Sequence, residues 1–160
     1  RQSSPFESEV AVRKSIVSLS FLALAACGNP DTPGGRAADA RHEHFETLGK
    51  SFKTIDDQLK ASQPDFTAIR KSAQDIATMS NLLSSWFPKG SSKADGLRTH
   101  ALQAVWTNPV EFNQATTRFT QAASAFNVVA QRTDKASIGD GLKSLGEACK
   151  GCHDKFREPD

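Results

Sequence analysis

The sequence lacks tyrosine altogether, and it has only one methionine, two tryptophans and three cysteines. Phenylalanine supplies most of the aromatic residues, and alanine is abundant. No segment shows the strict alternation of apolar and polar residues that is typical of a half-buried β-strand. These absences favour an all-α protein whose core is built from phenylalanine, alanine and aliphatic side chains.

Charge of one sign is not concentrated in any part of the chain. The 20 lysine and arginine residues stand against 18 aspartate and glutamate residues, which leaves a formal net charge of +2 over 160 residues. Proteins that bind nucleic acid carry a clustered basic face, so we expect no nucleic-acid partner. No combination of general acid, general base and nucleophile stands out either, which favours a binding protein over an enzyme.

The apolar run over residues 16–26 is short, because a helix that spans a bilayer needs about 20 apolar residues. Arg13 and Lys14 precede the run, and small residues end it. A basic start, a short apolar stretch and small residues at its end are typical of an export signal. We therefore expect residues 1–27 to direct the protein to the periplasm; residues 1–12 receive no structural role.

The end of this signal, Leu24-Ala25-Ala26-Cys27, resembles a bacterial lipobox, in which the cysteine is lipidated. The alternative is a plain signal sequence with a cysteine near its cleavage site. We favour lipidation of Cys27, because an unpaired cysteine in an exported protein needs an explanation. A lipid anchor at Cys27 would hold the protein at a membrane surface. Residues 28–36 are rich in glycine and proline and predict a flexible tether.

Four amphipathic segments follow the tether. The first, over residues 37–61, carries apolar residues at helical spacings of three and four: Phe45, Leu48, Phe52, Ile55 and Leu59. The second extends over residues 62–87, the third begins at Asn108, and the fourth runs over residues 134–157. With one longer connection over residues 88–107, this pattern predicts an antiparallel up-down four-helix bundle within residues 37–160.

Capping residues mark two of the predicted helix starts. Ser62 and Asp65 flank Pro64 in the order of a capping box, with Ser62 as the expected cap of the second helix. Asn108 and Pro109 open the third helix in the same manner, as a cap followed by a proline in the first turn.

The strongest motif is Cys149-Lys150-Gly151-Cys152-His153. The pattern C-x-x-C-H is the attachment site of a c-type haem, in which the thiols add to the two vinyl groups and the histidine binds iron. Cys149, Cys152 and His153 stand at i, i+3 and i+4, and therefore share one helix face. Because Cys149 and Cys152 continue the apolar stripe of the fourth segment, we expect one covalent haem c inside the bundle.

Two other interpretations of the motif are weaker. A structural zinc site needs four tetrahedral ligands, and Cys152 and His153 are adjacent in sequence, which is awkward for one metal. A thioredoxin-like redox pair accompanies a βαβ pattern, and none is visible in this sequence.

The motif and three other segments resemble the class II cytochromes c, and cytochrome c′ in particular. These segments are CKGCHDKFR over residues 149–157, WFPKGS over residues 86–91, AVW over residues 104–106 and RHEHFETLG over residues 41–49. Class I cytochromes c instead place the motif near the start of the chain and a methionine ligand downstream. No methionine follows His153.

The resemblance implies which residue faces the iron on the side opposite His153. Low-spin relatives place a methionine ligand at the position that Phe45 occupies here, and phenylalanine cannot ligate. We therefore expect a five-coordinate, high-spin haem with His153 as its only protein ligand. The single methionine, Met79, has its simplest interpretation as core filler in the second helix.

An apolar Phe45 offers no hydrogen bond to bound dioxygen, so the expected ligands are NO and CO. The resemblance also implies that Arg41 lies near a haem propionate and that Arg157 borders the His153 face. The alternative for Arg157 is a solvated cation that favours the helix dipole.

We expect the three remaining histidines to lie in different surroundings. His42 lies three residues before Phe45, nearer the same helix face, and is the better rival ligand for iron. His44 should point away from the iron, towards a propionate or a dimer face. His100 lies in the long connection, where a solvent-exposed side chain is the simplest interpretation.

Two functions follow from these expectations. The first is a periplasmic gas-binding cytochrome that captures NO and protects respiration. The alternative is a low-spin, one-electron carrier that serves redox partner proteins. Relatives often dimerise through their first two helices, so a homodimer is a further expectation from the resemblance.

Overall fold

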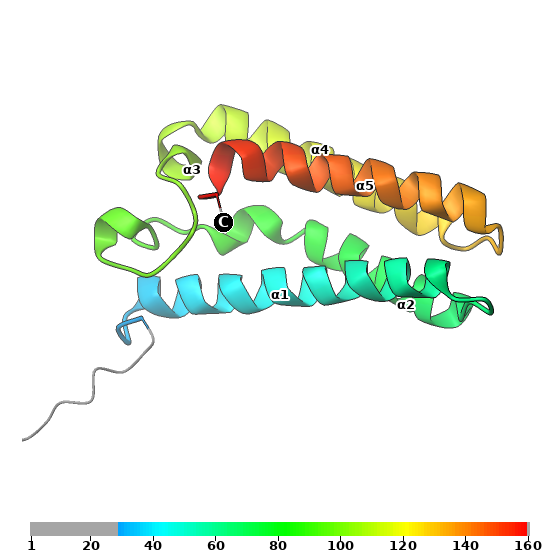
Figure 1. Cartoon of the computed structure of the whole chain (residues 1–160). Coiled ribbons are helices and arrows are strands. Elements are labelled where there is room, and N and C mark those ends of the chain that lie inside the picture. The colour runs from blue at the N-terminus through cyan, green and yellow to red at the C-terminus, as the bar shows by residue number, and fades with distance from the viewer. Residues whose placement is uncertain (1–28, 160) are drawn as a thin grey trace, which may run out of the picture.

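The computed structural model describes residues 29–159 and contains four long helices: α1 (Pro33–Lys60), α2 (Phe66–Ser80), α4 (Pro109–Val129) and α5 (Lys135–Phe156). Consecutive long helices run in opposite directions, so the described chain is an up-down four-helix bundle (Figure 1). The connection between α2 and α4 holds three short elements: the 3₁₀ turns η1 (Leu83–Trp86) and η2 (Lys93–Asp95), and helix α3 (Ala104–Thr107). The predicted fold class is confirmed.

Helix α1 begins at Pro33, before the position expected from the apolar stripe. The Thr32 side chain caps it by accepting a hydrogen bond of 3.0 Å from the Gly35 amide, and Pro33 occupies the first turn, where its missing N–H has no cost. The flexible tether predicted for residues 28–36 is therefore wrong for residues 33–36. The predicted export signal and Cys27 lie outside the described residues.

Helix α2 is shorter than predicted, and its cap is Asp65 rather than Ser62. The Asp65 carboxylate accepts hydrogen bonds from the amides of Thr67 and Ala68, at 2.8 and 3.1 Å. After Ser80 the chain leaves the α-helix and continues into η1.

Polar side chains at this end of α2 explain the early stop. Ser80 Oγ and Asn81 Nδ2 both donate to the Ala77 carbonyl, at 2.8 and 3.0 Å. Such local bonds offer the backbone an alternative to a continued helix. Trp86 therefore ends a 3₁₀ turn, and Phe87 lies just beyond it.

The other two long helices begin where the sequence predicts. Helix α4 starts at Pro109, although the preceding Asn108 makes no side-chain capping bond. Helix α5 starts after Asp134, whose carboxylate accepts hydrogen bonds from the amides of Ala136 and Ser137 at 3.1 and 3.2 Å.

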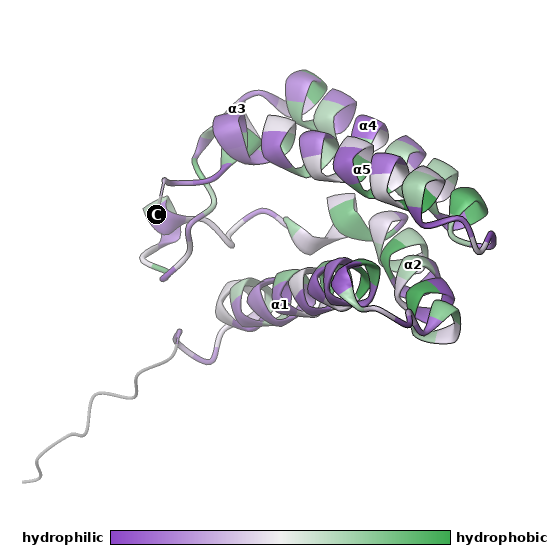
Figure 2. Cartoon of the chain, turned by 45° about the vertical axis from the view of Figure 1, so that its right-hand side comes forward, coloured by the Kyte–Doolittle hydropathy of each residue, from purple (hydrophilic) through white to green (hydrophobic). Residues whose placement is uncertain are grey.

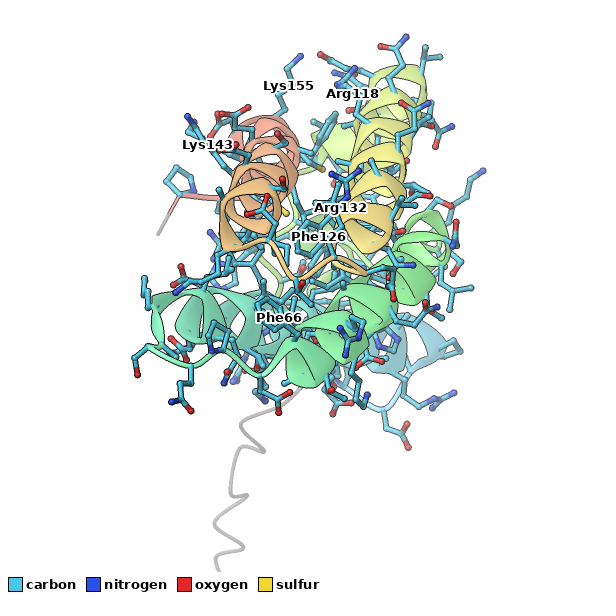
Figure 3. The ribbon with its side chains drawn as sticks, turned by 90° about the vertical axis from the view of Figure 1, so that its right-hand side faces the viewer. Phe66, Arg118, Phe126, Arg132, Lys143 and Lys155 are labelled. Carbon is cyan, nitrogen blue, oxygen red and sulfur yellow. The ribbon has the colours of Figure 1, made fainter. Side chains whose placement is uncertain are left out.

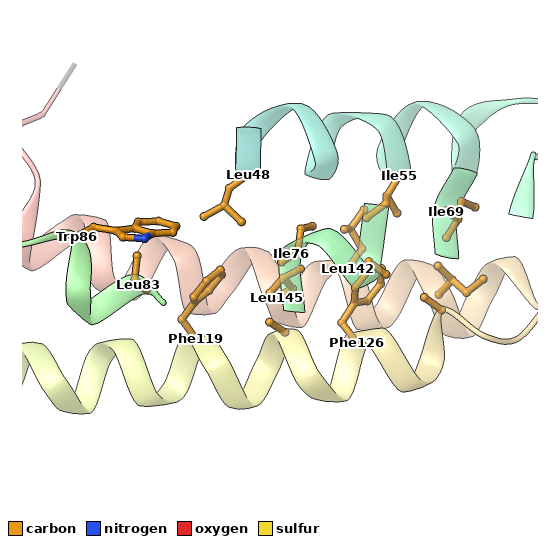
Figure 4. Packing of buried hydrophobic residues seen from close by; sticks show 14 residues of the cluster. Leu48, Ile55, Ile69, Ile76, Leu83, Trp86, Phe119, Phe126, Leu142 and Leu145 are labelled. Atoms are coloured by element: carbon orange, nitrogen blue, oxygen red, sulfur yellow. The ribbon is translucent and has the colours of Figure 1, made fainter. Parts of the chain in front are cut away.

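The main core lies between the four long helices (Figure 4). Its largest fully buried side chains come from all of them: Ile55, Ile69, Ile76, Phe126, Ile138 and Leu145. Burial of one such side chain contributes about 1.5–3 kcal/mol. Met79 packs half-buried against this core, as its interpretation as core filler requires.

A second, smaller apolar cluster lies at the end of the bundle that contains α3. It comprises Val105, Phe112, Ala115 and Phe156. Phe87 packs against both clusters and therefore joins them. In Figure 1 the C-terminal end of α5, drawn in red, lies beside α3 at this same end of the bundle.

The helices are amphipathic, with hydrophilic and hydrophobic residues mixed along each (Figure 2). Viewed from the end of the bundle, Phe66 and Phe126 point between the helices, whereas Lys143 and Lys155 point outward (Figure 3). Among the described residues, none of the helices has the length and apolar character needed to cross a membrane.

Candidate haem site

The C-x-x-C-H motif lies in the last two turns of α5. Cys149 is half-buried and packs against the main core, whereas Cys152, one turn later, packs against the second cluster. His153 is exposed. The two thiols therefore lie where the two apolar clusters meet, and the imidazole lies beside them on the same helix face, as predicted from the spacing.

Cys149 and Cys152 form no disulfide with each other, and their surroundings favour the protonated form of each. Burial raises the pKa of Cys149 to about 11, and the neighbouring Cys152 adds to the effect. Burial also raises the pKa of Cys152, against an opposing attraction from Arg118 on α4. Burial thus disfavours the thiolate form of both side chains before any haem is attached.

Phe45 on α1 faces the motif. Its ring centroid lies 6.3 Å from that of His153, with the planes 68° apart. Two further rings stand edge-on to it, Trp86 at 5.5 Å and Phe87 at 6.2 Å. Phe45, Trp86 and Phe87 form a group that we call the aromatic wall. Phe45 therefore lies close to the imidazole of His153, and its predicted place opposite the haem iron stays a prediction.

Arg41, one turn before Phe45 on α1, is 3% exposed. Its Nη1 donates to the Trp86 carbonyl and to Ser91 Oγ, at 3.1 and 3.0 Å. Its Nη2 donates to the Ser91 carbonyl and to Thr99 Oγ1, both at 2.9 Å. These four bonds use all the donors on Nη1 and Nη2 and leave Nε–H for any further partner.

All four acceptors around Arg41 are neutral, and no carboxylate pairs with it in the described part of the chain. Its guanidinium also lies over the rings of Phe87 and Trp106, at 4.8 and 5.8 Å from their centroids. Burial lowers the pKa of Arg41 to about 10. A buried cation with no counterion favours an anion brought in by a ligand.

Arg157 follows α5 directly and is half-buried. It forms an isolated antiparallel bridge with Ala101 in the connection between α2 and α4. The Leu102 amide donates to the Phe156 carbonyl at 2.9 Å, and the Glu158 amide donates to the His100 carbonyl at 2.7 Å. The residues after the motif are therefore fixed against the connection, and Arg157 lies one turn from His153, as its sequence position predicts.

The other histidines lie at different distances from the site. His42 has a side chain 70% exposed and pairs with Glu46 at 3.4 Å, which does not support it as a rival iron ligand. His44 packs on the Trp86 ring, with centroids 4.6 Å apart, and so lies nearer the aromatic wall than expected. His100 is exposed, as expected, and lies 3.9 Å from Glu158.

The sequence did not indicate that Trp86 and Phe87 face Phe45, or that Ser91 and Thr99 bind Arg41. Phe52 was also expected only as a core residue, yet its ring lies over Gly146 of α5, 3.5 Å from where a Cβ would stand. A glycine on the inner side of a helix was the one available signal, because it permits a close approach.

The residues present fit a covalently held porphyrin. Cys149 and Cys152 offer two thiols one turn apart, and His153 offers an imidazole nitrogen on the same face. The surrounding side chains are apolar and aromatic, as a porphyrin plane requires, and the buried cation of Arg41 suits a propionate.

Comparison with known proteins agrees with this fit. The profile of the cytochrome c′ family matches residues 36–157. Cytochrome c′ of Pararhodospirillum photometricum is 32% identical over 118 residues, which cover 74% of this chain and 93% of that protein. Cytochrome c-554 of Cereibacter sphaeroides is 27% identical over 146 residues, which cover 90% of this chain and 95% of that protein.

Solved structures share the fold. The nitric oxide complex of a variant of cytochrome c prime from Alcaligenes xylosoxidans superposes with a TM-score of 0.70 and 20% identity, covering 79% of this chain and 97% of that one. The sequence match covers most of the chain, and the shared bundle agrees with it. The chain therefore belongs to the cytochrome c′ family, whose members carry one covalent haem c.

Proposed function

We propose that this protein is a gas-binding cytochrome whose haem iron has His153 as its only protein ligand. The observation that carries the proposal is the contact between Phe45 and His153 across the seam of α1 and α5. Phenylalanine has no atom that can bind iron, so Phe45 would leave the iron without a second protein ligand. A bound haem would then supply a coordination position for a diatomic gas.

The motif residues have separate roles in this proposal. Cys149 and Cys152 would hold the porphyrin by thioether bonds, and His153 would bind the iron. Arg41 contributes a buried positive charge for a propionate, with Nε–H as its remaining donor. Arg157, one turn beyond His153, is held by its bridge with Ala101, and the resemblance implies that it borders the His153 face.

The aromatic wall selects among gases. Phe45 and Phe87 carry no polar atom in their side chains, and the Trp86 ring stands edge-on to Phe45. Bound dioxygen gains negative charge and is stabilised by a hydrogen-bond donor, whereas NO and CO need none. An apolar wall thus favours NO and CO. The nitric oxide complex of the Alcaligenes xylosoxidans protein supports this choice of ligand class.

The proposed setting is the periplasm, where capture of NO would protect respiration. The membership of the cytochrome c′ family supports an exported haem protein. A lipid anchor at Cys27, a homodimer and redox partner proteins remain predictions from the sequence.

The optical spectrum of the mature protein tests the proposal. A broad Soret band in the ferrous protein that sharpens and shifts on addition of CO is the expected result, because a five-coordinate iron can accept the gas. A narrow, split α band that CO does not change would instead mean that a side chain fills the sixth position. That result would replace gas binding with one-electron transfer.

A further inference from the structure

The aromatic wall comes from two parts of the chain, and only one of them is a regular helix. Phe45 stands on α1, but Trp86 and Phe87 belong to the connection that follows α2. Residues 87–103 of this connection contain only the single turn η2, and Gly90 and Gly96 adopt a φ of +80°. Regular secondary structure therefore does little to hold this part of the wall in place.

The bridge between Ala101 and Arg157 holds the far end of this connection, and Arg41 restrains the part from Trp86 to Thr99. Its four hydrogen bonds reach Trp86, Ser91 and Thr99, which span residues 86–99 of the connection. Two of the four acceptors are backbone carbonyls, so the bonds fix the course of the chain as well as its side chains. Because Arg41 is buried, these bonds are made away from competing water.

The same guanidinium organises the rings. It lies over Phe87 and Trp106, and the Trp106 indole N–H in turn donates to the carbonyls of Phe87 and Pro88 at 3.2 and 3.1 Å. Phe87 is thus held by a cation on its face and by an indole at its backbone. The backbones also meet directly, since a Cβ on Gly34 of α1 would lie 1.9 Å from the Gly90 carbonyl oxygen.

We propose that Arg41 is a positioning residue that holds residues 86–99 against α1 and thereby sets the aromatic wall over the gas site. This inference rests on the proposed function for its consequence, although the restraint itself belongs to the chain. Lysine cannot replace arginine here, because a single ammonium group cannot reach four acceptors arranged on two sides of a planar fork.

Hydrogen exchange of the holoprotein, followed by mass spectrometry, tests the restraint directly. In Arg41→Met we expect peptides covering residues 86–106 to exchange about tenfold faster, while peptides from α4 and α5 stay near the wild-type rate. Arg41→Lys should give most of this effect, and Thr99→Val, which removes one acceptor, a smaller one. If Arg41→Met fails to fold, the exchange rates of Thr99→Val still test the restraint.

The matched control is Ile69→Val, which trims a fully buried side chain of the main core and lowers stability without touching the connection. Exchange in this control should rise throughout the core, with no preference for residues 86–106. If the Arg41 variants show the same general pattern as the control, or leave residues 86–106 unchanged, the positioning role is overturned.

Flash photolysis of the ferrous CO complex supplies the functional readout. A loosened wall should admit CO about threefold faster or more in Arg41→Met, and less so in Thr99→Val, while Ile69→Val keeps the wild-type rate. An unchanged rate together with localised exchange would overturn the link from Arg41 to the gas site. If the wild-type protein binds no CO, the proposed function fails, and the exchange pattern still decides whether Arg41 holds the connection.

Discussion

The ring of Phe45 on α1 faces the imidazole of His153 on α5, with centroids 6.3 Å apart and planes at 68°. The two residues are more than 100 positions apart in sequence, and the up-down order of the helices brings them together. Under the proposed function, the side chain at position 45 would therefore face the iron that His153 binds. This relationship makes position 45 the most informative site for substitution.

Phe45→Met should convert the iron to a six-coordinate, low-spin state, because a thioether sulfur would then lie opposite His153. We expect the affinity for CO to fall by about tenfold or more, since the gas must displace the sulfur. Absorption spectroscopy and CO titration measure both changes. Phe45→Leu is the control and should stay high-spin; a high-spin Phe45→Met would show that position 45 does not face the iron.

His153→Ala should remove the protein ligand from iron without releasing the haem, because the thioethers at Cys149 and Cys152 are independent of the imidazole. Intact mass should show that the haem is retained, while the Soret band shifts and added imidazole restores it in part. His42→Ala is the control, as its exposed side chain pairs with Glu46. A wild-type spectrum in His153→Ala would rule out His153 as the ligand.

Acid should weaken the start of α5. The Ser137 side chain and the amides of Ser137 and Ala136 hold the pKa of Asp134 below its ordinary value. A carboxyl with a lowered folded pKa stabilises the fold above the unfolded pKa, near 3.9, and loses this contribution as pH falls through the folded pKa.

Asp134→Asn isolates that effect. The melting temperature of the wild type should exceed that of the variant at pH 5–6, and the difference should shrink as pH falls below about 4. Asp140→Asn, on the same helix beyond its first turn, is the control for removal of a charge. A wild-type advantage that stays constant down to about pH 2 would contradict the assignment.

Two glycines should respond to alanine in opposite ways. In Gly34→Ala the new Cβ would meet the Gly90 carbonyl oxygen at 1.9 Å, so we expect a loss of about 1–3 kcal/mol in the free energy of unfolding. Gly139 lies inside α5 with nothing within 4 Å of a Cβ, so Gly139→Ala should gain about 0.5–1 kcal/mol. Urea unfolding of the holoprotein measures both, and equal effects would contradict the packing at Gly34.

The sequence could predict the features that depend on short-range patterns. Apolar spacings located the long helices, and the fixed spacing of Cys149, Cys152 and His153 placed three ligating groups on one face. The end of α2 was harder to predict, because the side chains of Ser80 and Asn81 compete with the helix for the Ala77 carbonyl. The start of α1 was also missed. Glycine and proline over residues 28–36 were interpreted as a flexible tether, whereas the Thr32 side chain caps a helix that begins at Pro33.

The surroundings of Arg41 could not be predicted, because its acceptors are backbone carbonyls and small hydroxyls far along the chain. Nothing in the residue types of Ser91 or Thr99 distinguishes them from the other serine and threonine residues of the chain. Their role depends on where the connection folds back over α1. Long-range polar contacts of this kind need a tertiary structure, whereas the expectation that Phe45 lies opposite His153 came from the resemblance to the class II cytochromes c.

The bridge between Ala101 and Arg157 restrains the His153 side of the candidate haem site. Beyond His153 the chain is clamped, with Glu158 bonded to the His100 backbone and paired with Lys93 at 2.6 Å. The C-terminal end of α5, which carries His153, is therefore held firmly in place. When an incoming molecule needs space, we therefore expect the aromatic wall to move rather than the end of α5.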